Sequence, residues 1–136
     1  MPAETDLQTL IASMSPMPRE GSFVFVSVPF DVAVGIRAEA TVAEAEGLTL
    51  VLTQQDADAR AFSYDVVMAW ITLQVHSSLS AVGLTAAFSS ALAAAGVSCN
   101  VLAGVYHDHL LVPVDDLERA VMVLEELSAT TRRLLG

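Results

Sequence analysis

The segment Trp70–Asn100, WITLQVHSSLSAVGLTAAFSSALAAAGVSCN, decides the predicted fold, because it contains a strand, a polar loop and a helix in that order. Residues 67–75 are mostly apolar and predict a buried strand, and residues 76–80 form the polar loop. The helix that follows ends before Gly96, since glycine readily adopts the left-handed conformation found after a helix. Apolar residues recur on one face of this helix, namely Leu84, Phe88, Ala91, Leu92 and Ala95.

Beyond Gly96 the pattern predicts two more strands and a final helix. The strands cover residues 97–102 and 109–114, and the helix opens with Asp115 and Glu118 in the spacing of a capping box. Residues 66–130 therefore have the order β-α-β-β-α, which lacks one strand of the ferredoxin-like βαββαβ unit. The missing strand must come from elsewhere in the chain.

The first half of the chain is rich in strands and short of helix. Its expected elements are a helix from Thr5 or Asp6 to Met14, strands over 22–28, 38–44 and 48–53, a loop over 29–37 and a short helix over 54–60. Neither half has enough surface to bury a core alone. We therefore expect an α+β protein of two interleaved ferredoxin-like units with antiparallel sheets, divided into residues 1–64 and 65–136.

Composition narrows the classes of function. The 136 residues are 54% hydrophobic, so the chain has ample apolar surface to form a core. Sixteen acidic residues stand against six arginines, and the net charge of −10 disfavours nucleic acid and anionic lipid surfaces as partners. The single cysteine, Cys99, has no partner for an intrachain disulfide, and its place in a predicted strand indicates a buried, inert thiol. These features fit a cytoplasmic protein.

An uncharged stretch raises the alternative of a membrane span. No residue from Val66 to His107 carries a formal charge, and Leu79–Val97 approaches the length that a bilayer requires. Gly96 interrupts this stretch as a helix end, and no nearby Lys or Arg flanks it to orient a span. We therefore expect a buried helix and no membrane contact.

Several motifs, taken in order, resemble the ACT domain, a small regulatory ligand-binding module. They are Trp70–Asn100 with Gly83 at the helix start and Gly96–Val97 after the helix, Glu44–Val51, and Asn100–Pro113. The resemblance spans residues 22–128. It extends to uncharacterised bacterial tandem-ACT proteins and to the repeat unit of the animal cytosolic arginine sensor, and it implies two ACT-type units.

The resemblance also implies that a free amino acid or a similar small metabolite binds at an interface between ACT units. The implied ligand-binding residues lie in a strand-to-helix loop and in a turn before a strand: Ser78, Ser80, Ala81, Val82 and Gly83, then Gly104, Val105, His107 and Asp108. Asp108 matches the acid that meets the guanidinium in the arginine sensor. Ala81 stands where that sensor has a second acid, which argues against arginine as the ligand.

The loop before the helix also suits an anionic group on physical grounds. A helix N-terminus that contains glycine offers unpaired amide donors and the positive end of the helix dipole. Ser77, Ser78 and Ser80 add hydroxyl donors. The same serines equally suit a structural role, in which they cap the helix and keep the turn polar.

Two catalytic alternatives start from the histidines. The triplet His107–His109 suggests a metal site, with His76 as a further ligand. Strand alternation places the two histidines of the triplet on one face and Asp108 on the other, so we expect no metal and no cofactor. A hydrolytic centre of Ser77 or Ser78 with His76 and Asp108 lacks a Gly-x-Ser-x-Gly motif, and we expect no catalytic residue.

These inferences lead to one expected function and two alternatives. We expect a non-catalytic regulatory or sensor protein that binds a free amino acid or small metabolite and forms a homodimer, and that acts either by ligand-dependent assembly or by presenting a surface to another protein. The first alternative is a ligand-free structural module for protein interaction. The second is a metal-dependent enzyme at the His107–His109 turn.

Overall fold

The computed structural model describes residues 6–75, 79 and 81–136, which belong to two compact units. The larger unit comprises Met1–Arg19 and Ala69–Gly136, and the smaller unit comprises Glu20–Met68. The chain thus begins and ends in the same unit, and the smaller unit is inserted between the two parts of the larger one.

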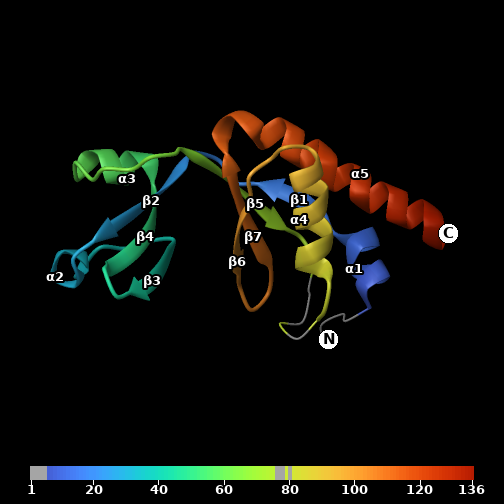
Figure 1. Ribbon diagram of the computed structural model, residues 1–136, viewed down its shortest axis with the longest axis horizontal. Coiled ribbons are helices and arrows are strands. Elements are labelled where there is room, and N and C mark those ends of the chain that lie inside the picture. Colours follow the sequence, from blue (N-terminus) through green and yellow to red (C-terminus); the bar gives the residue numbers. More distant parts are fainter. Residues whose placement is uncertain (1–5, 76–78, 80) are drawn as a thin grey trace. The chain divides into compact units, whose positions relative to one another are not determined.

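The smaller unit is an antiparallel sheet with short helices (Figure 1). Its elements are β2 (Phe23–Val28), α2 (Phe30–Ala33), β3 (Ala40–Glu44), β4 (Gly47–Thr53) and α3 (Gln54–Ala59). Strand β4 pairs with both β2 and β3. Alternate strand residues, among them Val24, Val26 and Leu50, form its buried core, as the two-residue period of a strand requires. Phe23 also pairs with Met68, the first residue of β5.

The described part of the larger unit is a sheet with the strand order β1-β5-β7-β6 and three helices. Its elements are α1 (Leu7–Ser13), β1 (Pro16–Pro18), β5 (Met68–Leu73), α4 (Leu84–Ala94), β6 (Asn100–Ala103), β7 (Asp108–Pro113), the 3-10 turn η1 (Val114–Asp116) and α5 (Leu117–Leu135). Strand β1 runs antiparallel to β5, with Met17 opposite Thr72. It is the strand that the β-α-β-β-α pattern lacks, and it comes from the start of the chain.

The helices pack on one face of this sheet, where the core of the larger unit lies. Alternate residues of β5 and β7 point into that core, as Ile71 and Leu110 do, and both are fully buried. Phe88 and Leu92 of α4 and Leu124 of α5 meet them there. The apolar face predicted for the residue 84–95 helix is therefore confirmed.

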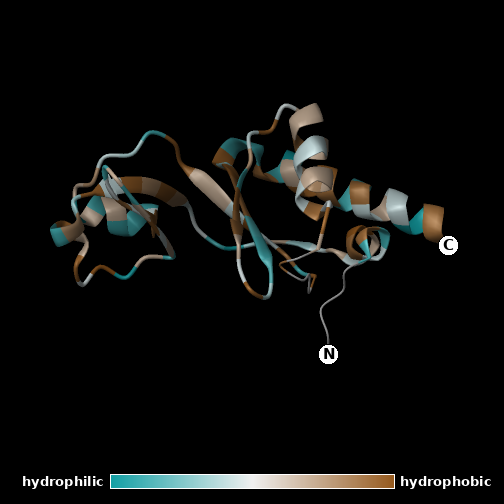
Figure 2. Cartoon of the chain, turned by 60° about the horizontal axis from the view of Figure 1, so that its bottom comes forward, coloured by the Kyte–Doolittle hydropathy of each residue, from teal (hydrophilic) through white to brown (hydrophobic). Residues whose placement is uncertain are grey.

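Helix α5 is amphipathic, and in Figure 2 hydrophobic and hydrophilic segments alternate along it. It packs against α1, which lies beside it in Figure 1. The contact includes a buried polar residue that the hydrophobic pattern does not reveal, Ser128, whose hydroxyl donates to the carbonyl oxygens of Ala12 (3.0 Å) and Met14 (3.2 Å). Arg132 also donates to the Ala12 carbonyl oxygen, at 2.9 Å.

The ends of α1 and α4 follow the sequence prediction. Asp6 caps α1 by accepting a hydrogen bond from the Thr9 amide at 3.0 Å. Gly96 has φ of +75°, and after it the amide of Val97 donates to the carbonyl of Leu92 at 2.9 Å, which closes α4 in a Schellman motif.

Three local predictions were wrong. The expected loop 29–37 contains α2, because the amides of Val32 and Ala33 bond the Pro29 carbonyl and close one helical turn. Strand β6 begins at Asn100 rather than at residue 97, since Val97 belongs to the end of α4. The capping box does not form: Asp115 lies in η1, and Asp116, the N-cap residue, makes no side-chain capping bond but pairs with Arg119 at 2.9 Å.

The Ser128 contact predicts a stability effect. Ser128→Ala removes the hydroxyl donor that the Ala12 and Met14 carbonyls share, although Arg132 still donates to Ala12, and we expect the free energy of unfolding to fall by about 1–2 kcal/mol. Urea denaturation followed by circular dichroism measures this change. The matched control is Ser90→Ala on the exposed face of α4, and equal stability of the two variants would contradict a role for Ser128.

Candidate functional site

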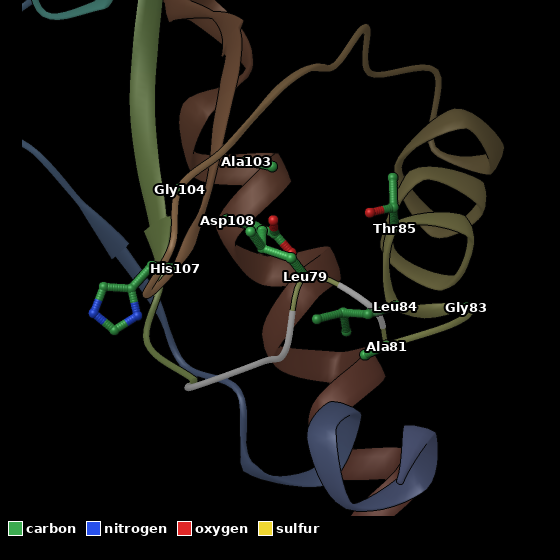
Figure 3. Close-up of a pocket in the computed structure, with 9 residues that line it drawn as sticks. All are labelled: Leu79, Ala81, Gly83, Leu84, Thr85, Ala103, Gly104, His107 and Asp108. Atoms are coloured by element: carbon green, nitrogen blue, oxygen red, sulfur yellow. The ribbon is translucent and has the colours of Figure 1, made fainter. Parts of the chain in front are cut away.

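A cavity of about 190 Å³ lies in the larger unit, between the start of α4 and the turn that joins β6 to β7 (Figure 3). Its walls come from the segment before α4, from the first turn of α4 and from the β6–β7 turn. The lining residues are Leu79, Ala81, Gly83, Leu84, Thr85, Ala103, Gly104, His107 and Asp108.

The start of α4 has a geometry that glycine provides. Gly83 is the N-cap residue, its φ is +101°, and the amide of Ala87 donates to its carbonyl as the first bond of the helix, at 2.9 Å. A Cβ atom on Gly83 would lie 2.9 Å from Cδ2 of Leu7. Because glycine has no side-chain oxygen, the N-cap residue itself offers no side-chain hydrogen bond to the first amide groups of α4.

The β6–β7 turn is tight and also contains glycine. The Gly104 amide donates to the His107 carbonyl oxygen at 2.9 Å, and Ala103 pairs with Asp108 across the two strands. A Cβ atom on Gly104 would lie only 2.9 Å from that same carbonyl oxygen. This close approach of the backbone sets the position at which β7, and with it Asp108, begins.

Asp108 is the ionisable side chain that faces the cavity. Figure 3 shows its carboxylate on the cavity side, with Thr85 across from it, and the His107 ring turned away. Nδ1 of His107 lies 3.3 Å from the Val75 carbonyl oxygen instead. Partial burial raises the pKa of the Asp108 carboxyl, and His109 opposes part of that effect. Within the described residues, the Asp108 carboxylate has no hydrogen-bond partner.

The structure brings together five of the nine residues implied by the family resemblance: Ala81, Gly83, Gly104, His107 and Asp108. Val82 and Val105 do not line the cavity, and their side chains are 82% and 67% exposed. Ser78 and Ser80 lie outside the described residues, so the choice between ligand contact and capping stays a prediction.

Sequence reasoning missed four lining residues, Leu79, Leu84, Thr85 and Ala103. The helical pattern assigns Leu84 to the core, and this pattern alone does not indicate that Leu84 also lines the cavity. Thr85 had a usable signal, because a hydroxyl in the first turn after a glycine N-cap lies near the unpaired amide groups.

The alternatives that start from histidine have little support in the described part of the chain. No group of three or more His, Cys, Asp or Glu side chains there is placed to hold a metal ion. Asp108 faces the cavity, whereas His109 bonds Thr72 on the other face of the sheet. The hydrolytic alternative depends on His76, Ser77 and Ser78, which lie outside the described residues. Cys99 is half-buried, and burial raises the pKa of its thiol, as expected for an unreactive cysteine.

Among the described helices, none is both long and apolar enough to cross a membrane.

Comparison with protein families agrees with this architecture. ACT-domain family models match residues 2–69 and residues 66–126. The chain belongs to the ACT domain family. The resemblance inferred from sequence motifs and the ferredoxin-like α+β fold are therefore confirmed. ACT domains are regulatory, ligand-binding modules.

Solved structures give the same picture for this ACT protein. A Vibrio cholerae protein of unknown function, described as a possible transport protein, is 41% identical with a TM-score of 0.81, over 90% of this chain and 95% of that one. The ligand-free regulatory subunit of aspartate kinase from Thermus thermophilus has a TM-score of 0.63 at 9% identity, over 82% and 95% of the two chains. At that identity the likeness shows the fold alone. Comparison with curated protein sequences gives no match.

Gly83 provides a test of the site's backbone. Both Gly83 and Gly96 have positive φ, so alanine at either position costs about 1–2 kcal/mol of folding free energy in backbone strain. Only Gly83 also meets a side chain, Leu7, and nothing lies within 4 Å of a Cβ atom at Gly96. We expect Gly83→Ala to lower the urea midpoint more than Gly96→Ala. Equal effects would show that the Leu7 contact relaxes without cost.

Proposed function

We propose that this ACT protein is a non-catalytic regulator that binds a free amino acid in the cavity between α4 and the β6–β7 turn. The observation that carries the proposal is the half-buried Asp108 carboxylate, which faces the cavity without a hydrogen-bond partner among the described residues. Polar groups in such places normally find a partner, and a ligand with a cationic donor supplies one.

The other side of the cavity favours the opposite charge. Helix α4 is eleven residues long, its first turn holds no acidic residue, and its N-cap makes no side-chain bond. The amides of this first turn, which the N-cap residue does not cap, and the positive end of the helix dipole therefore favour a carboxylate there. The Thr85 hydroxyl lines the same side of the cavity and adds a donor. An amino acid carries an ammonium and a carboxylate group, which matches these two sides.

The size of the cavity limits the ligand. Its volume of 190 Å³ is near the roughly 150 Å³ of an apolar cavity that holds benzene. It is smaller than the roughly 300–1,000 Å³ typical of sites for drug-sized molecules. The cavity therefore favours a compact metabolite over a nucleotide.

The surroundings of the cavity favour an interface with a second copy of the chain. Four large apolar side chains near it are at least 66% exposed: Leu79, Val82, Val105 and Tyr106. We call them the apolar rim. Two of them, Val82 and Val105, are among the nine residues implied by the resemblance, although neither lines the cavity. A second copy packed on the rim would bury this apolar surface and enclose the ligand, which gives a homodimer with the ligand at an ACT–ACT interface.

Ligand binding is tested with Asp108→Asn, which keeps the shape of the side chain and removes its charge. We expect at least one of the twenty L-amino acids to raise the melting temperature of the wild-type protein, because binding to the folded state stabilises it. Loss of the charged hydrogen bond should weaken that binding by about 1.5–3 kcal/mol. Differential scanning fluorimetry and calorimetric titration measure both effects.

The matched control is Asp115→Asn, an exposed carboxylate in η1 away from the cavity. It should respond to amino acids as the wild type does. An equal response of the Asp108 variant would remove Asp108 from the site. Absence of any response in the wild type would favour the other candidate, a ligand-free interaction module, for which the apolar rim is the supporting observation.

The rim predicts an assembly defect. Val105→Glu places a charge on it, and we expect the dimer to dissociate into monomers, since an unpaired charge in an apolar interface is strongly unfavourable. Analytical ultracentrifugation measures the change. The control is Val34→Glu in the smaller unit, where Val34 is 81% exposed, and a wild-type dimer that tolerates Val105→Glu would place the interface elsewhere.

A further inference from the structure

The sheet face opposite the cavity carries a cluster of aromatic and polar side chains in the larger unit. Trp70 Nε1 lies 3.2 Å from His109 Nδ1 and 3.3 Å from Thr72 Oγ1, and Thr72 Oγ1 lies 3.0 Å from His109 Nδ1. The Arg19 guanidinium lies 4.7 Å from the centre of the Trp70 ring. His109 follows Asp108 in β7, so neighbouring side chains of one strand serve opposite faces of the sheet.

These contacts favour one of the two neutral forms of the His109 ring. The indole N–H of Trp70 can only donate, and it has two acceptors within reach, His109 Nδ1 at 3.2 Å and Thr72 Oγ1 at 3.3 Å, so these contacts favour a ring whose Nδ1 carries no hydrogen and can accept. In this neutral form the proton is on Nε2. A proton added to Nδ1 would remove this acceptor, bring the indole N–H and the new N–H close to each other, and leave Thr72 Oγ1 as the acceptor that both donors share.

The other edge of the same ring meets the cavity wall. A Cβ atom on Gly104 would lie 3.2 Å from His109 Nε2, so the Gly104 backbone packs directly against the imidazole. Gly104 lines the cavity and bonds His107 across the turn that leads into Asp108. The ring is thus held between β5, through Trp70 and Thr72, and the turn that positions the Asp108 carboxylate.

We propose that neutral His109 is a positioning residue for Asp108, and that a proton on His109 weakens amino acid binding in the cavity. The ligand part of this inference rests on the proposed function. The positioning part rests on the contacts of His109 with Trp70, Thr72 and Gly104 alone.

The surroundings of His109 also favour its neutral form. Burial lowers the pKa of His109, the nearby His107 and Arg19 lower it further, and Asp108 opposes them. A ligand ammonium at Asp108 would offset that carboxylate, and by reciprocity a proton on His109 disfavours the ammonium. Because the folded pKa lies below the ordinary value of about 6.5, stability and affinity are complete above about pH 6.5 and fall as the pH drops below it.

The first test needs no ligand, because Trp70 is the only tryptophan in the chain. We expect its fluorescence to change in a single transition below about pH 6.5 in the wild type. His109→Gln keeps an acceptor oxygen for the indole and cannot titrate, so its fluorescence should stay constant. His107→Gln should retain the transition, and far-ultraviolet circular dichroism checks that all variants stay folded at each pH.

Hydrogen–deuterium exchange then reports on the turn itself. Corrected for intrinsic rates, the amides of residues 104–108 should exchange faster at about pH 5.5 than at about pH 7.5 in the wild type. The same comparison should show no difference in His109→Gln. Either of two results would overturn the positioning role. One is a fluorescence transition that persists in His109→Gln. The other is an exchange rate of the turn that does not depend on pH in the wild type.

The ligand test uses the twenty L-amino acids as probes at both pH values. For any that bind, we expect the loss of affinity between about pH 7.5 and about pH 5.5 to be at least about fivefold larger in the wild type than in His109→Gln, where the Asp108 carboxyl, whose pKa burial raises, still titrates. Equal pH dependence in the two proteins refutes the coupling while the proposed function survives. If no amino acid binds, but fluorescence and exchange respond as expected, the proposed function fails and the positioning role of His109 stands.

Discussion

The pairing of β1 with β5 is the interaction on which the larger unit depends. A β-α-β-β-α segment leaves the edge of its first strand with unpaired main-chain donors and acceptors, which a folded chain must cover. Residues 16–18 cover that edge, and the pairing is extended at both ends: Gln74 bonds the Ser15 carbonyl at 2.7 Å, and Arg19 bonds the Trp70 carbonyl at 2.8 Å. Because β1 pairs with β5, the helix that precedes β1, α1, packs on α5. Leu7 of this helix lies against Gly83, the N-cap residue of α4. The lining residues of the candidate site all lie after β5, but the first part of the unit supports the site from behind through Leu7.

The side chains of strand β7 have different roles, which depend on the face of the sheet and on the position along the strand. Its alternate residues Leu110 and Val112 are fully buried under the helices. Asp108 lies on this same face, but at the open end of the strand, where the core stops and the cavity begins. His109 points the other way, to Trp70 and Thr72. One strand thus contributes to the core, to the cavity and to the cluster that holds the cavity wall.

The sequence predicted what local pattern determines and missed what distant contacts determine. The helix before Gly96 and the strands around it follow from periodicity and from the conformational freedom of glycine, and the structure contains them. Strand β1 has three residues, two of them proline, and only its pairing with β5 makes it a strand. The motifs singled out Asp108, but the partner of His109 is Trp70, which lies 39 residues earlier, and no local spacing indicates that contact. The buried position of Ser128 was missed for the same reason, because its hydrogen-bond acceptors lie more than one hundred residues away in the sequence.

The way the cavity walls are supported bears on how a bound metabolite could act. Gly83 packs against Leu7 from outside the cavity, and Gly104 packs against the ring of His109. These two parts of the wall are close-packed against other side chains, and close-packed groups do not deform gradually. A ligand that fits the cavity therefore changes the conformation of these walls little. A ligand shifts an equilibrium only through different affinities for two states, and the difference must then arise where the site is still open. In this unit that place is the apolar rim, whose exposed side chains lie close to the residues that would bind the ligand. Under the proposed function, the state that a bound amino acid would select is thus a state of assembly, in which a second surface covers the rim, rather than a rearranged fold of the chain itself.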